Sequence, residues 1–362
     1  MKKTLLTACF LLICFSLSAQ KSIDLSGRWS FSVDRQDKGE IEKWFNRSLD
    51  DTINLPGSMP EKLKGDEVTA KTQWTGSLYD SSYYYNPYME KYRKEGNIKF
   101  PFFLTPDRHY VGVAWYQKEV NIPADWKGER IVLFLERPHI ETTVWVDGQK
   151  VGMQNSLCVP HEYDITRYLH SGKCKLAIRV DNRIKDINVG ADSHSITDQT
   201  QGNWNGIVGR ICLQTTPRTY FDDIQVYPEP EQNMARVRIV VKGSGNAEVK
   251  LSAQSFNTDK KHIVPAVKQE IKFKNGKAEA EIMLPMGKDM LLWDEFDPAL
   301  YRLTAEVTTG KKTDVKEVQF GMRRFEIKGK WFYVNGRKTM LRGTVENCDF
   351  PLTGYAPMDV ES

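Results

Sequence analysis

Apolar and polar residues alternate with a period of two over most of this chain, from residue 27 to about residue 320. Residues 27–33 read Gly-Arg-Trp-Ser-Phe-Ser-Val, which is one clear instance of the pattern. Such alternation is typical of a strand that buries one face of a sheet, because successive side chains of a strand point to opposite faces. Helical periodicity is scarce. The pattern therefore predicts an all-β protein.

Turn residues divide this alternation into many short strands. Asp147-Gly148 lies between two alternating segments, and so does Asn275-Gly276. Both dipeptides favour the two-residue turns of β-hairpins. Many short strands with regular turns indicate a β-sandwich or a β-barrel, and we assign residues 20–228 to a first domain of this kind. Its other alternating segments are residues 115–122, 130–135, 175–180 and 207–213.

A second β-domain is expected at residues 229–320. The proline-rich segment 227–231 reads as a linker before it. About seven alternating segments then follow within roughly ninety residues, which is the size and rhythm of an immunoglobulin-like sandwich. The Cys…Trp…Cys marker of antibody domains is absent. Further along, residues 339–343 read as a short buried strand that follows a turn at Asn335-Gly336.

Residues 1–19 have the composition of a secretory signal peptide. Lys2 and Lys3 precede an almost entirely apolar stretch at residues 5–17, and the small residue Ala19 comes before Gln20. About 13 apolar residues are too few for the roughly 20 that span a bilayer. We therefore expect cleavage after Ala19 and a periplasmic or secreted protein of a Gram-negative bacterium, with no membrane partner once the signal is removed.

Four cysteines remain after cleavage, and an exported compartment permits disulfides among them. None belongs to a Cys-x-x-Cys pair or lies beside a histidine at metal-ligand spacing, so no zinc site is expected. Buried free thiols are the preferred interpretation, and a disulfide of unassigned pairing is the alternative. The four residues are Cys158, Cys174, Cys212 and Cys348.

The residues alone offer no catalytic constellation. Gly-x-Ser-x-Gly and phosphate-binding glycine motifs are absent. Two acidic clusters, residues 61–67 and 294–297, read as a charged surface and a solvated turn rather than as paired catalytic carboxylates. The net charge of +4 is spread along the chain without a basic run, so no nucleic-acid partner is expected.

Two segments are candidates for ligand binding. The first is the loop at residues 105–110, at the end of a tyrosine-rich insert at residues 58–110. The insert is longer than ordinary connections, and a carbohydrate face and a packed interface explain it equally well. The second is the loop at residues 192–206, which combines a carboxylate, amides, hydroxyls and Trp204. These groups hold a sugar by hydrogen bonds and ring stacking. An irregular surface loop is the alternative for this second segment.

Several motifs occur in a specific order along the chain. They are Trp-Tyr-Gln-Lys at 115–118, Val-Trp-Val-Asp-Gly at 144–148, Gly-Ile-Val-Gly-Arg-Ile at 206–211, Phe-Gly-Met-Arg at 320–323 and Leu-Arg-Gly at 341–343. Together they resemble glycoside hydrolase family 2, which includes β-galactosidases, β-glucuronidases and β-mannosidases. The resemblance implies a jelly-roll, galactose-binding-like domain at residues 20–228, an immunoglobulin-like β-sandwich at 229–320, and at 321–362 a linker with the first hairpin and strand of a truncated catalytic TIM barrel.

The resemblance also implies an exported, retaining exo-glycoside hydrolase that acts on an oligosaccharide or polysaccharide. Such enzymes use two glutamates on later barrel strands, so the catalytic residues are expected beyond Ser362 and this chain alone is expected to be inactive. The expected partners are the carbohydrate substrate and the missing barrel of the same protein. No cofactor is expected in this chain, because a family-type divalent or monovalent ion would depend on barrel residues. The alternatives are a non-catalytic carbohydrate-binding module and a β-sandwich scaffold protein.

In family members the jelly roll lends a loop to the active site, and residues 198–205 resemble that loop. Arg108 or His109 would suit a uronic-acid carboxylate, with a structural ion pair as the preferred alternative. Galactosidases commonly read Val-Asn-x-His after the Leu-Arg-Gly motif, whereas residues 344–347 read Thr-Val-Glu-Asn, which disfavours plain galactose. The implied sugar contacts are Asp198, Gln199, Asn203 and Trp204, with Asp107, Arg108 and His109 as weaker candidates.

Overall fold

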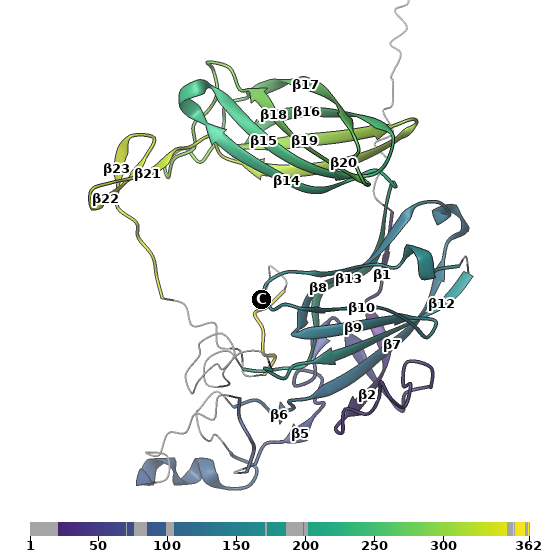
Figure 1. Cartoon of the computed structure of the whole chain (residues 1–362). Coiled ribbons are helices and arrows are strands. Elements are labelled where there is room, and N and C mark those ends of the chain that lie inside the picture. Colours follow the sequence, from purple (N-terminus) through teal and green to yellow (C-terminus); the bar gives the residue numbers. More distant parts are fainter. Residues whose placement is uncertain are drawn as a thin grey trace, which may run out of the picture. The chain divides into compact units, whose positions relative to one another are not determined.

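The structure is a computed structural model of the chain. It describes residues 21–69, 71–75, 85–98, 105–170, 172–185, 198, 202–345, 350, 352–358 and 361. These residues are almost entirely β-structure, with a few short 3-10 helices such as η1 (Pro87–Arg93) (Figure 1). The predicted all-β class is confirmed. None of the described helices is long and apolar enough to cross a membrane.

The chain divides into two compact units. Residues 22–215 and 340–362 belong to one unit, and residues 216–339 belong to the other. The chain therefore enters the second unit before the proline-rich segment 227–231, which the sequence suggests as a linker. That segment instead ends strand β14 (Tyr220–Glu229), which pairs with β15 (Met234–Lys242).

The first unit is built from two sheets. One has the strand order β10-β9-β12-β7-β2-β3, and the other has the order β1-β13-β8-β11 with β4 paired to β13. The Asp147-Gly148 turn joins β9 to β10 in a hairpin, as predicted. The strands of the first sheet are β2 (Gly27–Asp34), β3 (Asp51–Leu55), β7 (Val113–Ile122), β9 (Glu141–Val146), β10 (Gln149–Asn155) and β12 (Gly172–Asp181). Those of the second are β1 (Ser22–Asp24), β4 (Gly57–Ser58), β8 (Arg130–His139), β11 (His161–Asp164) and β13 (Gly206–Thr216).

The alternation buries one face of each sheet in a common core. On β2, Trp29 and Phe31 are each 1% exposed, and they belong to the same apolar cluster as Leu133 and Leu135 of β8. Each fully buried side chain of this size contributes about 1.5–3 kcal/mol to the stability of the sandwich. Ser30, between the two aromatic residues, points to the opposite face because side chains alternate along a strand.

That opposite face of the six-stranded sheet is partly covered by the segment between β2 and β3. Trp44 and Phe45 of this segment pack against Trp115 of β7 and Trp145 of β9. The rings of Phe45 and Trp145 stack with their centroids 5.2 Å apart. This aromatic layer holds residues 44–49 against the sheet.

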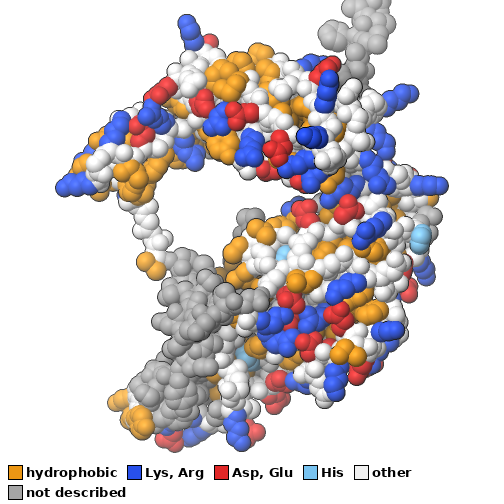
Figure 2. All heavy atoms as spheres, viewed as in Figure 1, with side chains coloured by type: hydrophobic (Ala, Val, Ile, Leu, Met, Phe, Trp, Pro, Cys, Tyr) orange, Lys and Arg blue, Asp and Glu red, His pale blue; other side chains and the backbone are white. Residues whose placement is uncertain are grey.

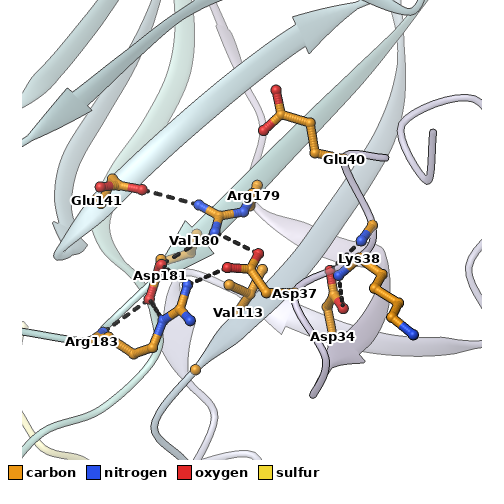
Figure 3. A network of polar contacts seen from close by, with 12 residues as sticks. Asp34, Asp37, Lys38, Glu40, Val113, Glu141, Arg179, Val180, Asp181 and Arg183 are labelled. Atoms are coloured by element: carbon orange, nitrogen blue, oxygen red, sulfur yellow. Dashed lines mark hydrogen bonds and ion pairs between the residues drawn. The ribbon is translucent and has the colours of Figure 1, made fainter. Parts of the chain in front are cut away.

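A buried ionic network lies on the same face, at one end of β12 (Figure 3). Arg179 forms ion pairs with Asp37 at 2.8 Å, Glu141 at 3.0 Å and Asp181 at 3.2 Å. Arg183 pairs with the same two aspartates. Burial alone would raise the pKa of Asp181, but hydrogen bonds from Arg183 and other cations outweigh it and hold that pKa well below its usual range. The network ties residue 37 to β12.

The second unit is a sandwich of seven strands around its own apolar core. One sheet has the order β14-β15-β18 and the other has the order β17-β16-β19-β20, which confirms the predicted immunoglobulin-like sandwich. The hairpin predicted around Asn275-Gly276 is wrong, because only the bridge Lys274↔Lys277 flanks the turn, and β17 and β18 then pair with different sheets. The remaining strands are β16 (Asn246–Phe256), β17 (Ile263–Lys272), β18 (Lys277–Pro285), β19 (Leu300–Thr309) and β20 (Lys312–Phe320).

A small three-stranded sheet follows this sandwich. Its strands are β21 (Phe325–Lys328), β22 (Trp331–Val334) and β23 (Arg337–Thr339), and the Asn335-Gly336 turn joins the last two as predicted. The buried strand expected at residues 339–343 is not formed: β23 ends at Thr339, and Met340 and Leu341 are 65% and 62% exposed. A strand needs a neighbour for its backbone hydrogen bonds, and residues 340–345 belong to no strand of the described sheets.

Candidate functional site

Segment 353–358 lies against the first unit beside Trp204. The Ser58 hydroxyl donates a hydrogen bond to the carbonyl of Thr353. The rings of Tyr355 and Trp204 meet with centroids 5.7 Å apart. A Cβ added to Gly354 would lie 2.4 Å from Cδ1 of Trp204, so the backbone of the segment is in close contact with the indole. Trp204 is consequently only 7% exposed.

His139, at the end of β8, supports Trp204 from within the sandwich. The two rings stack with centroids 4.6 Å apart. His139 Nδ1 donates to the carbonyl of Trp204 at 2.7 Å, which fixes the proton on that nitrogen because a carbonyl only accepts. Burial lowers the pKa of His139 to about 4, so the ring is neutral at pH 7.

Glu61 provides the carboxylate of this cluster. The Tyr355 hydroxyl donates to Glu61 Oε2 at 2.5 Å, and Lys62 forms an ion pair with the other oxygen. Although burial raises the pKa of Glu61, the hydrogen bonds from Lys62 and Tyr355 keep it below the usual range. Burial and the neighbouring carboxylate both raise the pKa of Tyr355. The phenol therefore stays protonated and the carboxylate stays ionised at neutral pH.

Asp198 and Asn203 lie in the buried layer next to Trp204 and are 6% and 4% exposed. The Asp198 carboxylate accepts hydrogen bonds from the backbone amides of Thr75 at 2.6 Å and Asn203 at 2.7 Å. The Asn203 side chain exchanges hydrogen bonds with Asn182. Both predicted sugar contacts thus form hydrogen bonds within the protein, and neither side chain is open to solvent in this arrangement.

The second group of predicted contacts does not converge on one point. Asp107 is exposed. Arg108 forms an ion pair with Glu67 at 3.1 Å, which is the structural alternative considered for it. Only His109 lies beside the buried residues Asp198 and Asn203. Its Nε2 is 3.4 Å from Asp198 Oδ2, without hydrogen-bond geometry. Gln199 lies outside the described residues.

The tyrosine-rich insert is described in part. Tyr85 and Tyr88 are 84% and 82% exposed, and the Asn86 side chain caps η1 by accepting from the Tyr88 amide at 3.0 Å. Trp74 instead packs its ring on His109, with centroids 4.7 Å apart. The insert therefore contributes both exposed aromatic rings and one ring that packs beside the 198–205 loop.

The sequence singles out Trp204 as a possible sugar contact, but it gives no sign of four residues that the structure places near Trp204 or segment 353–358. The acidic cluster at 61–67 has the composition of a charged surface, and Tyr355 lies 294 residues from its partner Glu61. No local pattern connects positions so far apart. The only signal that pointed here was the family-like loop at 198–205. The missed residues are Ser58, Glu61, His139 and Tyr355.

The described residues include no group of three or more His, Cys, Asp and Glu side chains that would hold a metal ion. On the face in Figure 2, Lys and Arg side chains are interspersed with Asp and Glu. Cys158, Cys174 and Cys212 are free thiols, as predicted. The prediction of burial is right for Cys174 and wrong for Cys158, which is exposed. Cys348 lies outside the described residues.

Two family models match the chain. The sugar binding domain of the glycosyl hydrolases of family 2 matches residues 22–217, and a second model of the same family matches residues 219–323. The β-galactosidase of Oenococcus oeni is 24% identical over 93% of this chain and 31% of its own length. A putative β-glucuronidase of Formosa agariphila is 29% identical over 67% of this chain and 28% of its own length.

Solved structures show the same fold. A β-glucuronidase from Ruminococcus gnavus superposes with a TM-score of 0.62 at 18% identity, covering 90% of this chain and 49% of its own. β-Glucuronidase 2 of Bacteroides uniformis gives a TM-score of 0.66 at 19% identity, covering 93% of this chain and 37% of its own. The chain spans about half or less of the length of these proteins. Because the model of the sugar binding domain alone matches more than half of the 362 residues, the chain belongs to glycoside hydrolase family 2.

Proposed function

We propose that this chain is the N-terminal part of an exported, retaining exo-glycoside hydrolase that releases β-linked galactose or glucuronic acid from an oligosaccharide or polysaccharide. The observation that carries the proposal is the match of two family-2 modules in succession, at residues 22–217 and 219–323. The signal-like residues 1–19 support export. The cluster around Trp204 supports a role in holding the active site together, because segment 353–358 is docked there.

The catalytic pair is proposed to lie beyond Ser362. The retaining mechanism uses two carboxyl groups roughly 5–5.5 Å apart, one of which must be protonated at the working pH. Of the two carboxylates near Trp204, Asp198 accepts hydrogen bonds from two backbone amides, and the pKa of Glu61 is held below the usual range. Glu61 is therefore unsuited to the acid role, and we propose that it positions Tyr355 instead.

The test compares the present chain with the protein made by continuing its reading frame past Ser362. Each is assayed with an aryl β-galactoside and an aryl β-glucuronide. We expect turnover by the longer protein only, and preference for the glucuronide would agree with the departure of residues 344–347 from the galactosidase pattern. Turnover by the present chain would overturn the proposed location of the catalytic pair. A stop codon directly after Ser362 would favour a non-catalytic carbohydrate-binding module.

A further inference from the structure

The outer face of the six-stranded sheet is not covered along its whole length. The ionic network at Arg179 occupies one end, and the aromatic layer of Trp115 and Trp145 occupies the middle. At the other end the sheet forms the floor of an open groove of about 530 Å³, with Ser48 on its wall. This volume falls within the roughly 300–1,000 Å³ of typical ligand sites.

Neighbouring strands supply the floor of this groove in register. Thr52 of β3 lies opposite Ser30 of β2, and Ser30 lies opposite Gln117 of β7. Two residues further along β7, Glu119 lies opposite Lys175 of β12. All five point away from the core, because they alternate along their strands with residues that belong to it: Trp29, Phe31, Ile53, Tyr116, Val120, Cys174 and Leu176. The groove is therefore a polar patch built on a rigid sheet.

Arg28 is the one basic side chain of the groove that is exposed and has no ion-pair partner among the described residues. The Lys175 ammonium donates to the carbonyl of Arg47 at 2.8 Å, and that of Lys118 donates to the carbonyl of Arg28 at 3.0 Å. Three basic residues thus line the groove against the single acid Glu119. The local field favours an anion, and the Arg28 guanidinium is free to bind one.

The other groups of the groove suit a sugar. Ser30 and Thr52 supply hydroxyls to the groove. We propose that this groove binds the uronate or sulfate-ester group of an acidic saccharide, with Arg28 as the anion-binding residue. The choice of a saccharide over another anion rests on the proposed function.

This groove lies far from the Trp204 cluster. Lys175 is near the start of β12, whereas Asn205, next to Trp204 in the chain, donates to the carbonyl of Val180 near the end of β12. At about 3.3 Å per residue, the two places are some 15–20 Å apart along the strand. An acidic polysaccharide bound in the Arg28 groove would therefore occupy a site separate from the Trp204 cluster.

The test measures binding to the purified chain by titration calorimetry at low salt. The probes are a glucuronate-containing oligosaccharide, a sulfated oligosaccharide, a neutral oligosaccharide of the same length and inorganic sulfate. We expect at least one acidic oligosaccharide to bind about tenfold or more tightly than the neutral one, because a charge-assisted hydrogen bond forms. Which acidic probe binds identifies the group, and stronger binding of inorganic sulfate than of either oligosaccharide would overturn the saccharide assignment.

Variants locate the site. Arg28→Ala should weaken binding by about tenfold, and Ser30→Phe should block the groove without changing its charge. Arg238→Ala removes the same charge from β15 of the other unit and should leave binding unchanged. Equal binding by wild type and Arg28→Ala, loss in Arg238→Ala, or full binding by Ser30→Phe would each overturn the proposal. None of these outcomes depends on turnover, so failure here leaves the proposed hydrolase activity untouched.

Discussion

The Tyr355 hydroxyl donates a 2.5 Å hydrogen bond to Glu61, a residue 294 positions earlier in the chain. This bond, together with the contact of Gly354 with Trp204, fixes a C-terminal segment on the N-terminal sandwich. Trp204 resembles a sugar-stacking residue by sequence, but its ring is covered by that segment. In the structure, Trp204 contacts Gly354 and Tyr355, which belong to the chain that follows the second sandwich.

Removing the phenol should loosen this segment. Tyr355→Phe deletes a hydrogen bond to a charged group, which is worth about 1.5–3 kcal/mol, so amide hydrogen exchange over residues 352–358 should become about tenfold faster or more. Tyr88→Phe is the matched control, because Tyr88 is 82% exposed. Unchanged exchange in Tyr355→Phe would show that the hydrogen bond does not hold the segment.

Gly354→Ala should displace the segment more completely. Gly354 has a φ of +83°, and a Cβ there would lie 2.4 Å from the Trp204 ring. Both the backbone strain and the overlap oppose docking. We expect residues 352–358 to lose hydrogen-exchange protection while the two sandwiches keep theirs. Gly343→Ala, at a position where nothing lies within 4 Å of the added carbon, should leave protection unchanged.

The buried His139 should make stability depend on pH in a defined window. Its pKa falls from 6.5 in the unfolded chain to about 4 when folded, so between these values the unfolded state binds more protons and the free energy of unfolding rises with pH. The contribution is fully present above pH 6.5 and is lost as the pH falls toward 4, by roughly 3 kcal/mol in total. The free energy of unfolding, measured by denaturant titration across this range, should depend less on pH in His139→Gln than in the wild type. The exposed His170→Gln should show the same pH dependence as the wild type.

Removing the central cation of the ionic network at Asp181 should destabilise the protein. Arg179→Met removes the cation that Asp37, Glu141 and Asp181 share, while Arg183 and Lys185 remain as their partners. Breaking a buried ion pair costs about 3–5 kcal/mol, and because these cations remain we expect a loss near the lower end, about 3 kcal/mol. The side chain of Arg179 is 8% exposed, whereas that of Arg210, paired with Glu136, is 75% exposed. Arg210→Met should therefore change stability by about 1 kcal/mol or less. Equal losses in thermal stability for the two variants would contradict the importance of burial.

Much of the fold was predictable because it depends on local patterns. The alternation at residues 27–33 and the Asp147-Gly148 turn specify strands and a hairpin through forces that act between near neighbours. The Asn275-Gly276 turn has an equally strong local signal, yet its flanking strands separate into two sheets. Which sheet a strand joins depends on distant partners, and a single sequence does not reveal them.

The site was predictable only through resemblance, and then only in part. Asp198 and Asn203 remain predicted sugar contacts, and their hydrogen bonds with Thr75 and Asn182 follow from no spacing rule in the sequence. Glu61 is a second example, because the charged segment 61–67 around it has the composition of a solvated surface. Long-range contacts decide whether a polar residue faces a ligand or supports a loop.

The residues around Tyr355 and its segment also bear on the order in which the parts of the chain fold. Ser58, Glu61, His139 and Trp204 all lie within the first 204 residues. At about 5–20 residues per second, a ribosome needs roughly 10–30 s to make the chain from Trp204 to Tyr355. The N-terminal sandwich therefore has time to fold before the tyrosine emerges. Segment 353–358 can dock only where these four residues have been brought together. Its docking would therefore indicate that the N-terminal sandwich has folded correctly.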